Sequence, residues 1–405
     1  MTTPLSGTPN RNSYDVVIIG GAMMGASVAW FLSDNPDFNG SVLVVERDPS
    51  FETSSTAHTN SCMRQQFSES INVRISQFCA EFVTNFRAFM GNDGRVPDIP
   101  VHAFGYMYLA DTPEAADALR AAHAVQSACG AGTQLLTPDK IAAAYPFYDL
   151  DDIILGAHNP VDEGYFDGGT VFDWWRRSAR ERGVETVTNE VVGITTNPAG
   201  TGVDSVTLKS GEVITCGTVV NASGPRAAKT AAMAGLHLPV EPRKRYTFVI
   251  DAAKPLGQDL PLTVDPSGVH IRTDGTYYMV GCAPDDDPAV EPDDFAEDFT
   301  IWEQKAWPAI ATRIPQFEAV KVVNSWVGHY AYNTLDQNAI VGPHSNLRNF
   351  LFVNGFSGHG FQQAPAMGRG LSEWITYGEY RTLDLSPLGF DRVAAGNPLR
   401  ERAVI

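Results

Sequence analysis

Residues 14–25 read YDVVIIGGAMMG, a run of β-branched apolar residues that ends in two glycines. The apolar run, Tyr14 to Ile19, predicts a short strand buried on both faces. The stretch after the glycines, Met24 to Leu32, predicts a helix, and Val42 to Glu46 predicts a second buried strand. A strand–helix–strand unit of this length is typical of a parallel sheet.

The glycine turn matches a dinucleotide-binding fingerprint, because Glu46 ends the next strand about 20 residues after Gly25. Gly20 permits the tight turn, and Gly25 lets the helix pack close to the strand. The helix N-terminus then faces a diphosphate, while the Glu46 carboxylate can accept hydrogen bonds from ribose hydroxyls. Ala22 stands where such turns usually have a second glycine, and its methyl group is expected to press the phosphate slightly outward.

A second glycine cluster, GFSGHG at residues 355–360, lies near the other end of the chain. It follows a buried strand expected at Phe350–Val353 and precedes a helix expected at Ala364–Tyr377, with Pro365 in the first turn. A nicotinamide enzyme does not need such a cluster, whereas a flavin does, because the flavin ring must be held far from the adenine. The two clusters together favour FAD over a nicotinamide cofactor.

The middle of the chain has a different pattern, in which short strands alternate with helices. Strands are expected at Tyr106–Ala110, Ile153–His158, Val192–Thr196, Val203–Leu208, Val213–Asn221, Tyr246–Ile250, Gly268–Arg272, Tyr277–Gly281 and Val320–Tyr330. Helices are expected at Gln65–Phe89, Pro113–Cys129, Thr170–Arg182 and Asp294–Arg313. The sequence therefore predicts a mixed α/β (α+β) fold, with a Rossmann-like FAD-binding domain and a substrate domain built on a large mixed, partly antiparallel sheet.

The composition is that of a globular protein, with 43% apolar and 19% charged residues. The formal net charge of −18 disfavours nucleic acid and anionic membranes as partners. The five cysteines are widely spaced and form no C-x-x-C, which predicts reduced thiols, a cytoplasmic location and no zinc site. Val16–Leu32 is too short for a comfortable membrane span and Asp285–Asp298 lacks a calcium-loop pattern, so we expect no transmembrane segment and no metal.

Beyond the two turns, several motifs recur in the order found in one family. They are Glu46-Arg47, Ser55-Thr56, Arg64-Gln65-Gln66-Phe67-Ser68 and Asn221-Ala222-Ser223-Gly224-Pro225. Together with the glycine clusters they resemble the D-amino-acid-oxidase/glycine-oxidase superfamily of FAD-dependent amine oxidoreductases, which includes sarcosine oxidase and dimethylglycine dehydrogenase. The likeness covers nearly the whole chain and extends to a branch of mitochondrial FAD-dependent oxidoreductase-domain proteins implicated in the assembly of respiratory complex I.

The resemblance implies a discontinuous FAD-binding domain made of residues 14–93, 162–238 and 334–381. Residues 94–161 and 239–333 would form a substrate domain over the flavin, residues 382–405 would form a C-terminal tail, and no folate-binding extension would follow. The resemblance and the two turns together predict the cofactor-binding residues Gly20, Gly21, Ala22, Met24, Gly25, Glu46, Arg47, Ser54, Ser55, Thr56, His58, Arg64, Val191, Val192, Ala222, Ser223, Gly224, Gly355, Ser357, Gly358, His359, Gly360 and Gln362.

The expected chemistry is hydride transfer from an amine C–H bond to flavin N5, followed by hydrolysis of the imine. This transfer leaves negative charge at the N1–C2=O edge of the flavin. The backbone N–H groups of Gly358-His359-Gly360, and the positive end of the helix after them, are suited to stabilise that charge.

The amine must be uncharged to release hydride, so the pocket needs a base or strong desolvation. The candidate residues for the base are His270, His329, Tyr246 and Tyr330. A substrate carboxylate needs a cation, for which the candidates are Arg64, Arg245 and Arg272, although Arg64 matches an arginine near the flavin in relatives. An alkylammonium group could lie against Tyr246, Trp326, Tyr330 or Tyr332, which could equally be core aromatics.

Three departures from sarcosine oxidases bear on the substrate and the electron acceptor. Phe67 and Gln362 stand where those enzymes carry the arginine and the lysine that clamp the sarcosine carboxylate, so sarcosine is not the expected substrate. Tyr278–Gly281 corresponds to the strand that carries their oxygen-activating lysine. The missing charge favours a dehydrogenase that passes electrons to an electron-transfer protein, and oxygen stays the alternative acceptor.

The attachment of FAD has two interpretations. The cysteine that links the flavin in sarcosine oxidases falls near His329, so that thioether cannot form. Ser55-Thr56-Ala57-His58 resembles the Ser-Thr-x-His of dimethylglycine dehydrogenases, whose histidine is bonded to the flavin. We expect noncovalent FAD, with a histidyl link at His58 as the alternative.

Two functional hypotheses follow from the sequence. The first is an enzyme that oxidises a small-molecule secondary or tertiary amine, in particular an N-substituted amino acid. The second is a non-catalytic FAD-binding assembly or interaction protein.

Overall fold

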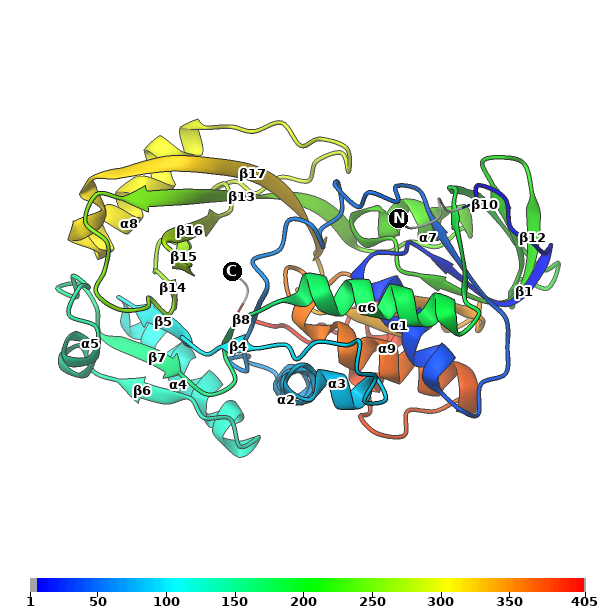
Figure 1. The fold of residues 1–405 in the computed structure, drawn as a ribbon, viewed down its shortest axis with the longest axis horizontal. Coiled ribbons are helices and arrows are strands. Elements are labelled where there is room, and N and C mark those ends of the chain that lie inside the picture. Colours follow the sequence, from blue (N-terminus) through cyan, green and yellow to red (C-terminus); the bar gives the residue numbers. More distant parts are fainter. Residues whose placement is uncertain (1–5, 404–405) are drawn as a thin grey trace.

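The computed structural model describes residues 6–403. The chain folds into two halves, each built on an eight-stranded sheet, and a three-stranded sheet lies where the halves meet (Figure 1). Two long strands, β13 (Val240–Ala252) and β17 (Val320–Asn333), run from the left half in this view toward the right half. The predicted mixed α/β fold with two large sheets is confirmed.

The sheet of the right half has the predicted strand–helix–strand unit at its centre. Its strands are β1 Ser13–Ile19, β2 Val42–Glu46, β9 Glu185–Thr188, β10 Val191–Thr196, β11 Val203–Leu208, β12 Val213–Asn221, β18 Ile340–Pro343 and β19 Phe350–Asn354. Their order is β10-β11-β12-β1-β2-β9, with β19 paired to the carboxyl end of β12 and β18 paired to β19. β9, β2, β1, β12 and β19 pair in parallel.

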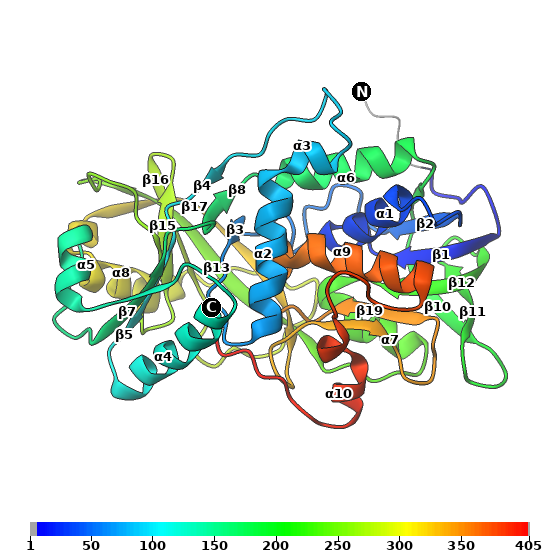
Figure 2. The ribbon, with the colours of Figure 1, turned by 90° about the horizontal axis from the view of Figure 1, so that it is seen from below.

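Helices cover both faces of this sheet. They are α1 Met23–Asp34, α2 Ser70–Thr84, α3 Phe86–Phe89, α6 Gly168–Glu181, α7 Ala227–Met233, α9 Gly360–Tyr377 and α10 Phe390–Ala394, with short helices η1 Gly224–Arg226 and η4 Ser386–Leu388. Val16 and Ile18 belong to the core shared with α1, α2, α6 and α9, whereas Val17 and Ile19 belong to the core shared with α7 and α10. Figure 2 shows α1 packed between α6 and α9. β1 is apolar at every position from Val16 to Ile19 because both of its faces are buried.

The sheet of the left half is mostly antiparallel. Besides β13 and β17 its strands are β5 Tyr106–Ala110, β6 Gln134–Leu136, β7 Leu155–Asn159, β14 Leu262–Val264, β15 His270–Asp274 and β16 Tyr277–Cys282, in the order β17-β13-β16-β15-β14-β5-β7-β6. Its helices are α4 Pro113–Ala128, α5 Pro138–Ala144, η2 Trp302–Ala306, α8 Trp307–Arg313 and η3 Pro315–Glu318. The small sheet between the halves is formed by β3 Cys62–Met63, β8 Gly164–Phe166 and β4 Val101–His102.

All strands expected in the middle of the chain are present, but β13 begins well before Tyr246. It starts at Val240 because it pairs with β17 along its whole length, from Val240–Asn333 to Ala252–Val320. The five cysteines are unpaired, as predicted. Within residues 6–403, none of the helices combines the length and the apolar character that crossing a membrane requires.

The helix predicted at Asp294–Arg313 was wrong in its first part. Helical structure begins only at Thr300 and continues through the π-helix η2 into α8. The Asp294 side chain accepts from Ala296 N (3.1 Å), and the Asp298 side chain accepts from Thr300 N (3.0 Å). The Asp294 bond competes with a helix, whereas the Asp298 bond lies directly at the start of the helix that follows.

The helix predicted at Gln65–Phe89 was also too long. It begins at Ser70, because carboxylates from distant segments bind the backbone before it: Glu163 accepts from Gln65 N (2.6 Å), and Glu401 accepts from Ser68 N (2.8 Å). At the other glycine cluster, α9 starts at Gly360. Pro365 therefore lies inside the helix and not in its predicted first turn.

A buried ion pair ties the C-terminal segment to the right half. Asp336 and Arg392 are 2.7 Å apart, and their side chains are 0% and 8% exposed. Substitution of Arg392 by Met should lower the free energy of unfolding by about 3–5 kcal/mol, because it leaves a buried carboxylate unpaired. Urea denaturation measures this loss.

The matched control is the exposed pair of Arg120 and Asp117, whose side chains are 51% and 76% exposed. Arg120→Met should change the unfolding free energy by less than about 1 kcal/mol. Equal effects of the two substitutions would contradict the structural role assigned to the buried pair.

Candidate active site

An elongated cavity of about 380 Å³ lies between the halves and is lined by both glycine clusters. Gly20 and Ala22 line it at one end, and Gly358, His359 and Gly360 line it further along. Segments from opposite ends of the chain thus meet in one cavity, as the sequence predicted.

The first glycine turn can be made only by glycine. Gly20 has a φ of +99°, and a Cβ atom there would lie 2.6 Å from the Ala222 carbonyl oxygen. A Cβ atom at Gly25 would overlap the Gly20 carbonyl oxygen. Only a glycine at position 25 therefore lets α1 pack this closely on the end of β1. Ala22 is the N-cap of α1 and offers no side-chain cap, so the helix end is open to an anion.

Glu46 is buried beneath this turn. Its carboxylate accepts from Gly21 N (2.7 Å) and from Asp48 N (2.8 Å). Burial raises the pKa of Glu46, against the lowering effect of these two N–H groups. Because a carboxylate has about four acceptor sites, the group can fix the turn and still accept from a ribose hydroxyl.

Cations at this end of the cavity are held by the acidic loop that enters η2. Arg47 and Arg226 both contact Asp293, and Lys229 contacts Glu291 at 2.7 Å. Arg47 was predicted, whereas Arg226 and Lys229 were missed. The only feature of the sequence that could have indicated them is their position, since Arg226 directly follows the Asn221–Pro225 motif.

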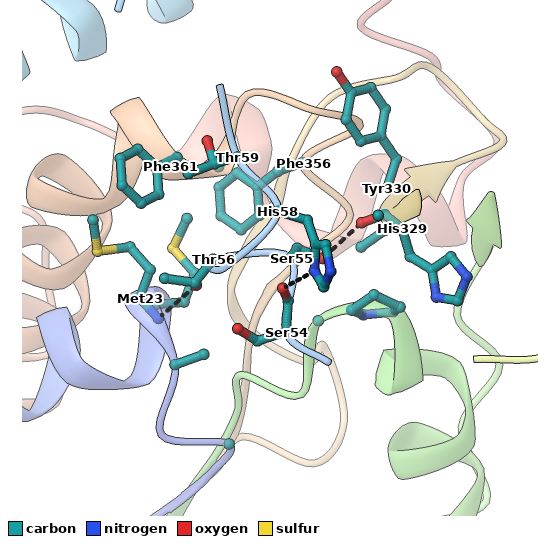
Figure 3. A pocket seen from close by; sticks show the side chains of 18 of the residues that line it. Met23, Ser54, Ser55, Thr56, His58, Thr59, His329, Tyr330, Phe356 and Phe361 are labelled. Atoms are coloured by element: carbon teal, nitrogen blue, oxygen red, sulfur yellow. Dashed lines mark hydrogen bonds between the residues drawn. The ribbon is translucent and has the colours of Figure 1, made fainter. Parts of the chain in front are cut away.

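The Ser54–His58 loop joins the two halves inside the cavity (Figure 3). Ser55 Oγ donates to the His329 carbonyl oxygen (2.6 Å), and Thr56 Oγ1 accepts from Met23 N (3.2 Å). His58 Nδ1 lies 3.0 Å from the Ser54 carbonyl oxygen. A carbonyl only accepts, so Nδ1 carries a proton and donates it to this oxygen.

The second glycine turn is also shaped by close contact. Gly358 has a φ of +97°, and a Cβ atom there would overlap the Tyr330 ring. The predicted set of three free N–H groups needs one correction, because His359 N donates to the Phe356 carbonyl oxygen (3.0 Å). Among the described residues, the N–H groups of Gly358 and Gly360 stay without a protein acceptor.

Arg64 is a buried cation on the wall of this cavity, with a side chain among the least exposed of the chain. Its guanidinium donates to the carbonyl oxygens of Gln66 and Ala403 and, at 3.0 Å, to His359 Nε2. Gln362 Oε1 accepts from Arg64 N (2.6 Å), so Gln362 holds the backbone of the arginine.

Two further groups set the charge around Arg64. Burial and the Arg64 charge hold the pKa of His359 well below its usual range, so the imidazole is neutral. Glu163, which the sequence did not reveal, accepts from Gln65 N (2.6 Å) and Gln66 Nε2 (2.9 Å). Burial raises the pKa of Glu163 to about 7.

The candidate substrate residues divide into two groups. His270, His329, Tyr246, Tyr330 and Arg245 line the cavity. Arg272, Trp326 and Tyr332 are not part of its lining. Arg272 is instead held by Asp274 (2.9 Å) and by the Asn60 carbonyl oxygen (3.0 Å), and the Tyr332 ring lies 4.0 Å from the Arg243 guanidinium.

The two lining histidines differ in their chemistry. Burial, with the charges of Arg245 and Arg272, lowers the pKa of His270 to about 4, and its Nε2 lies 2.9 Å from Asn60 Nδ2. His329 Nε2 donates to the Asp294 carbonyl oxygen (2.8 Å), which leaves the lone pair on Nδ1. Burial also lowers the pKa of His329, so both imidazoles are neutral at neutral pH.

Arg245 and Tyr246 are less able to act on a proton or an anion than the sequence suggested. The Arg245 guanidinium is paired with both oxygens of Asp287, at 2.7 and 3.1 Å. Burial raises the pKa of Tyr246, so its hydroxyl keeps its proton.

Five predicted cofactor residues are not in the cavity lining: Gly21, Gly25, Val192, Gly355 and Ser357. Three of them show the reason, which is a structural hydrogen bond or a side chain that points away from the cavity. Gly21 N binds Glu46, and Ser357 Oγ accepts from Asn333 N (3.0 Å). Val192 is 49% exposed because side chains alternate along β10 and its neighbour Val191 takes the inward position.

The cavity fits an extended dinucleotide such as FAD. One end offers an open helix N-terminus and a buried acidic side chain, and the other offers two free N–H groups at a turn that excludes any Cβ atom. Two anion-suited ends joined by one cavity are what a flavin dinucleotide requires.

Known proteins share both the motifs and the fold. A model of the family described as FAD dependent oxidoreductase matches residues 15–374. FAD-dependent oxidoreductase domain-containing protein 1 of Xenopus laevis is 35% identical over 436 residues, which cover 100% of this chain and 87% of that protein.

Two solved structures are similar in fold. L-proline dehydrogenase from P. horikoshii superposes with a TM-score of 0.82 at 24% identity, covering 96% of this chain and 99% of that one. Glycine oxidase from Geobacillus kaustophilus superposes with a TM-score of 0.78 at 21% identity, covering 94% and 98%. The predicted resemblance is confirmed, and the chain belongs to the DAO family of FAD-dependent oxidoreductases.

Proposed function

We propose that the protein oxidises a secondary or tertiary amine, in particular an N-substituted amino acid. In this proposal the half with the parallel sheet binds FAD, and the half with β13 and β17 binds the substrate. The observation that carries the proposal is that the neutral side chains of His270, His329 and Tyr246 share one cavity lining with the Gly358–Gly360 turn. Buried neutral side chains are suited to hold an amine in its uncharged form.

FAD, when bound, supplies the acceptor for a hydride from the carbon next to the amine nitrogen. The chain has three tasks. Burial at His270 and Tyr246 desolvates the amine and lowers its pKa. His329 Nδ1, which has the lone pair, accepts the amine proton, and the N–H groups of Gly358 and Gly360 stabilise negative charge. Water then hydrolyses the imine.

The cation for a substrate carboxylate is Arg64 in this proposal. Arg245 is already paired with Asp287, and Arg272 is not part of the cavity lining. Arg64 contacts only neutral acceptors among the described residues, so its charge is available to an anion in the cavity. Proline dehydrogenase and glycine oxidase, which share the fold, are named for amino-acid substrates.

The first test is anaerobic mixing of the yellow holoenzyme with a panel of N-methyl and N-carboxymethyl amino acids. We expect at least one of them to bleach the visible flavin band, because hydride transfer removes that absorbance. Failure of the whole panel to bleach the protein would favour a non-catalytic FAD-binding assembly protein.

Two matched histidine variants refine this test. His329→Ala should slow bleaching by about 100-fold, which is the contribution typical of a positioned base. His344→Ala, outside the cavity lining, should leave the rate unchanged. An unchanged rate in His329→Ala would mean that desolvation alone neutralises the amine.

We propose further that the enzyme is a dehydrogenase. Lys229 is the one lysine in the cavity lining formed by the described residues, and it lies at the opposite end, paired with Glu291. Without a lysine charge near the substrate end, superoxide is poorly stabilised. The reduced enzyme should therefore react at least about ten-fold faster with an artificial dye acceptor than with oxygen, a barrier difference of about 1.4 kcal/mol. Stopped-flow absorbance measures both rates, and a faster reaction with oxygen would identify an oxidase.

We propose noncovalent FAD. His58 is fixed by its Nδ1 bond to Ser54 and by its stacking on Phe295, with ring centroids 5.7 Å apart. Acid precipitation should release all yellow colour into the supernatant, as measured by absorbance. Colour retained in the pellet of the wild type, and lost from the pellet of His58→Ala, would instead show a histidyl link.

A further inference from the structure

The last described residues, up to Ala403, reach the cavity wall at Arg64. Figure 2 shows the C-terminal segment leaving α10 and running toward the region between the two halves. Leu399 N donates to Asp336 Oδ2 (2.9 Å), and the Leu399 carbonyl oxygen accepts from Asn338 Nδ2 (2.6 Å). The segment after Leu399 is thereby directed toward the start of α2.

Glu401 anchors this segment with a fully used carboxylate. It is 1% exposed and accepts from Ser68 N (2.8 Å), Ser68 Oγ (2.7 Å), Glu69 N (3.2 Å), Asn72 Nδ2 (2.9 Å) and Ala403 N (2.9 Å). No cation pairs with it among the described residues. These five donors come from two segments, residues 68–72 and Ala403. They fix the position of the carboxylate better than a salt bridge, since each donor restrains a different direction.

The anchored segment delivers one carbonyl group to Arg64. The Ala403 carbonyl oxygen accepts from Arg64 Nη2, the same nitrogen that donates to His359 Nε2. Ala403 also raises the pKa of His359, against the larger lowering effects of burial and of Arg64. The last described residue of the chain therefore acts on both polar side chains at this wall of the cavity.

Arg64 has little else to fix its guanidinium. Its other acceptors are the Gln66 carbonyl oxygen, only two residues away, and His359 Nε2 at 3.0 Å, and Phe67 lies under it with 4.0 Å between guanidinium carbon and ring centroid. The contacts to Gln66 and Phe67 are local and move with the loop. The Ala403 carbonyl oxygen and His359 Nε2 hold the arginine relative to the rest of the cavity, and both are bound by Nη2.

We propose that Glu401 is a positioning residue, which acts through the Ala403 carbonyl to hold Arg64 and its positive charge at the cavity wall. The inference rests on the proposed function, because it assumes that FAD occupies this cavity. A positive charge held beside the cofactor favours its reduced form, which is the more negative one.

The test is the midpoint potential of FAD in the holoenzyme, determined by redox titration. Glu401→Gln keeps the size of the side chain but turns an amide N–H₂ toward the donors, so the segment should detach and Arg64 should move. We expect a more negative potential, equivalent to a preference for reduced over oxidised cofactor that is about ten-fold weaker. Ser68→Ala, which removes one donor to Glu401, should shift the potential in the same direction by less.

The sign of the shift separates positioning from simple charge. Removal of the Glu401 charge alone would make the potential more positive, since it takes a negative charge away from the cofactor. Arg402→Ala is the matched control, because the Arg402 side chain is exposed and only its backbone contacts Ser68, so the potential should not change. An unchanged or more positive potential in both Glu401→Gln and Ser68→Ala would overturn the inference.

A double-mutant cycle with Arg64→Met tests the route of the effect. If Glu401 acts through Arg64, Glu401→Gln should cause no further shift in the Arg64→Met background. Additive shifts would show that Glu401 acts independently of Arg64. A wild-type protein that binds no FAD would contradict the proposed function itself, whereas a yellow wild type with an unaffected Glu401→Gln potential would contradict only this inference.

Discussion

The position of β12 between β1 and β19 is the constraint on which the rest of the site depends. Val219 of β12 pairs with Val17 of β1 and with Phe350 of β19, all in parallel. Parallel strands end at the same edge of a sheet, so the loops after all three strands meet there. The Gly20 turn, the Ala222–Gly224 segment and the second glycine cluster therefore line one cavity, although they are far apart in the chain.

The sequence predicted this part well because its requirements are local. A glycine is needed wherever a Cβ atom would collide with the backbone, as at Gly20 and Gly25, and such positions are visible without a structure. What could not be predicted depends on partners distant in sequence. Arg272 lies outside the cavity because the Asn60 carbonyl holds it, and residues 294–299 are not helical because Asp294 binds the backbone of Ala296. No pattern in the sequence predicts either the position of Arg272 or the absence of a helix in this segment.

Charge in the cavity is controlled by which cations are already paired. Asp287 neutralises Arg245, and Asp293 lies between Arg47 and Arg226, so an arginine in the lining is not by itself an anion site. Arg64 differs because its partners are carbonyl oxygens and a neutral imidazole. Dipoles stabilise a buried charge without cancelling it, so the field of Arg64 stays available inside the cavity. The sequence predicted Arg64 as a candidate cation, but it could not predict that Arg64 lacks an acidic partner among the described residues.

Because Arg64 is stabilised by dipoles, the position of its charge depends on how firmly the groups that carry these dipoles are held. An ion pair would pull Arg64 toward its partner, whereas a carbonyl holds it only where the backbone is itself restrained. The backbone on one side is restrained by Glu163 at Gln65 and on the other by Glu401 at Ala403. Two buried acidic side chains thus fix the arginine without touching it, which keeps negative charge away from its guanidinium while this cation stays in place.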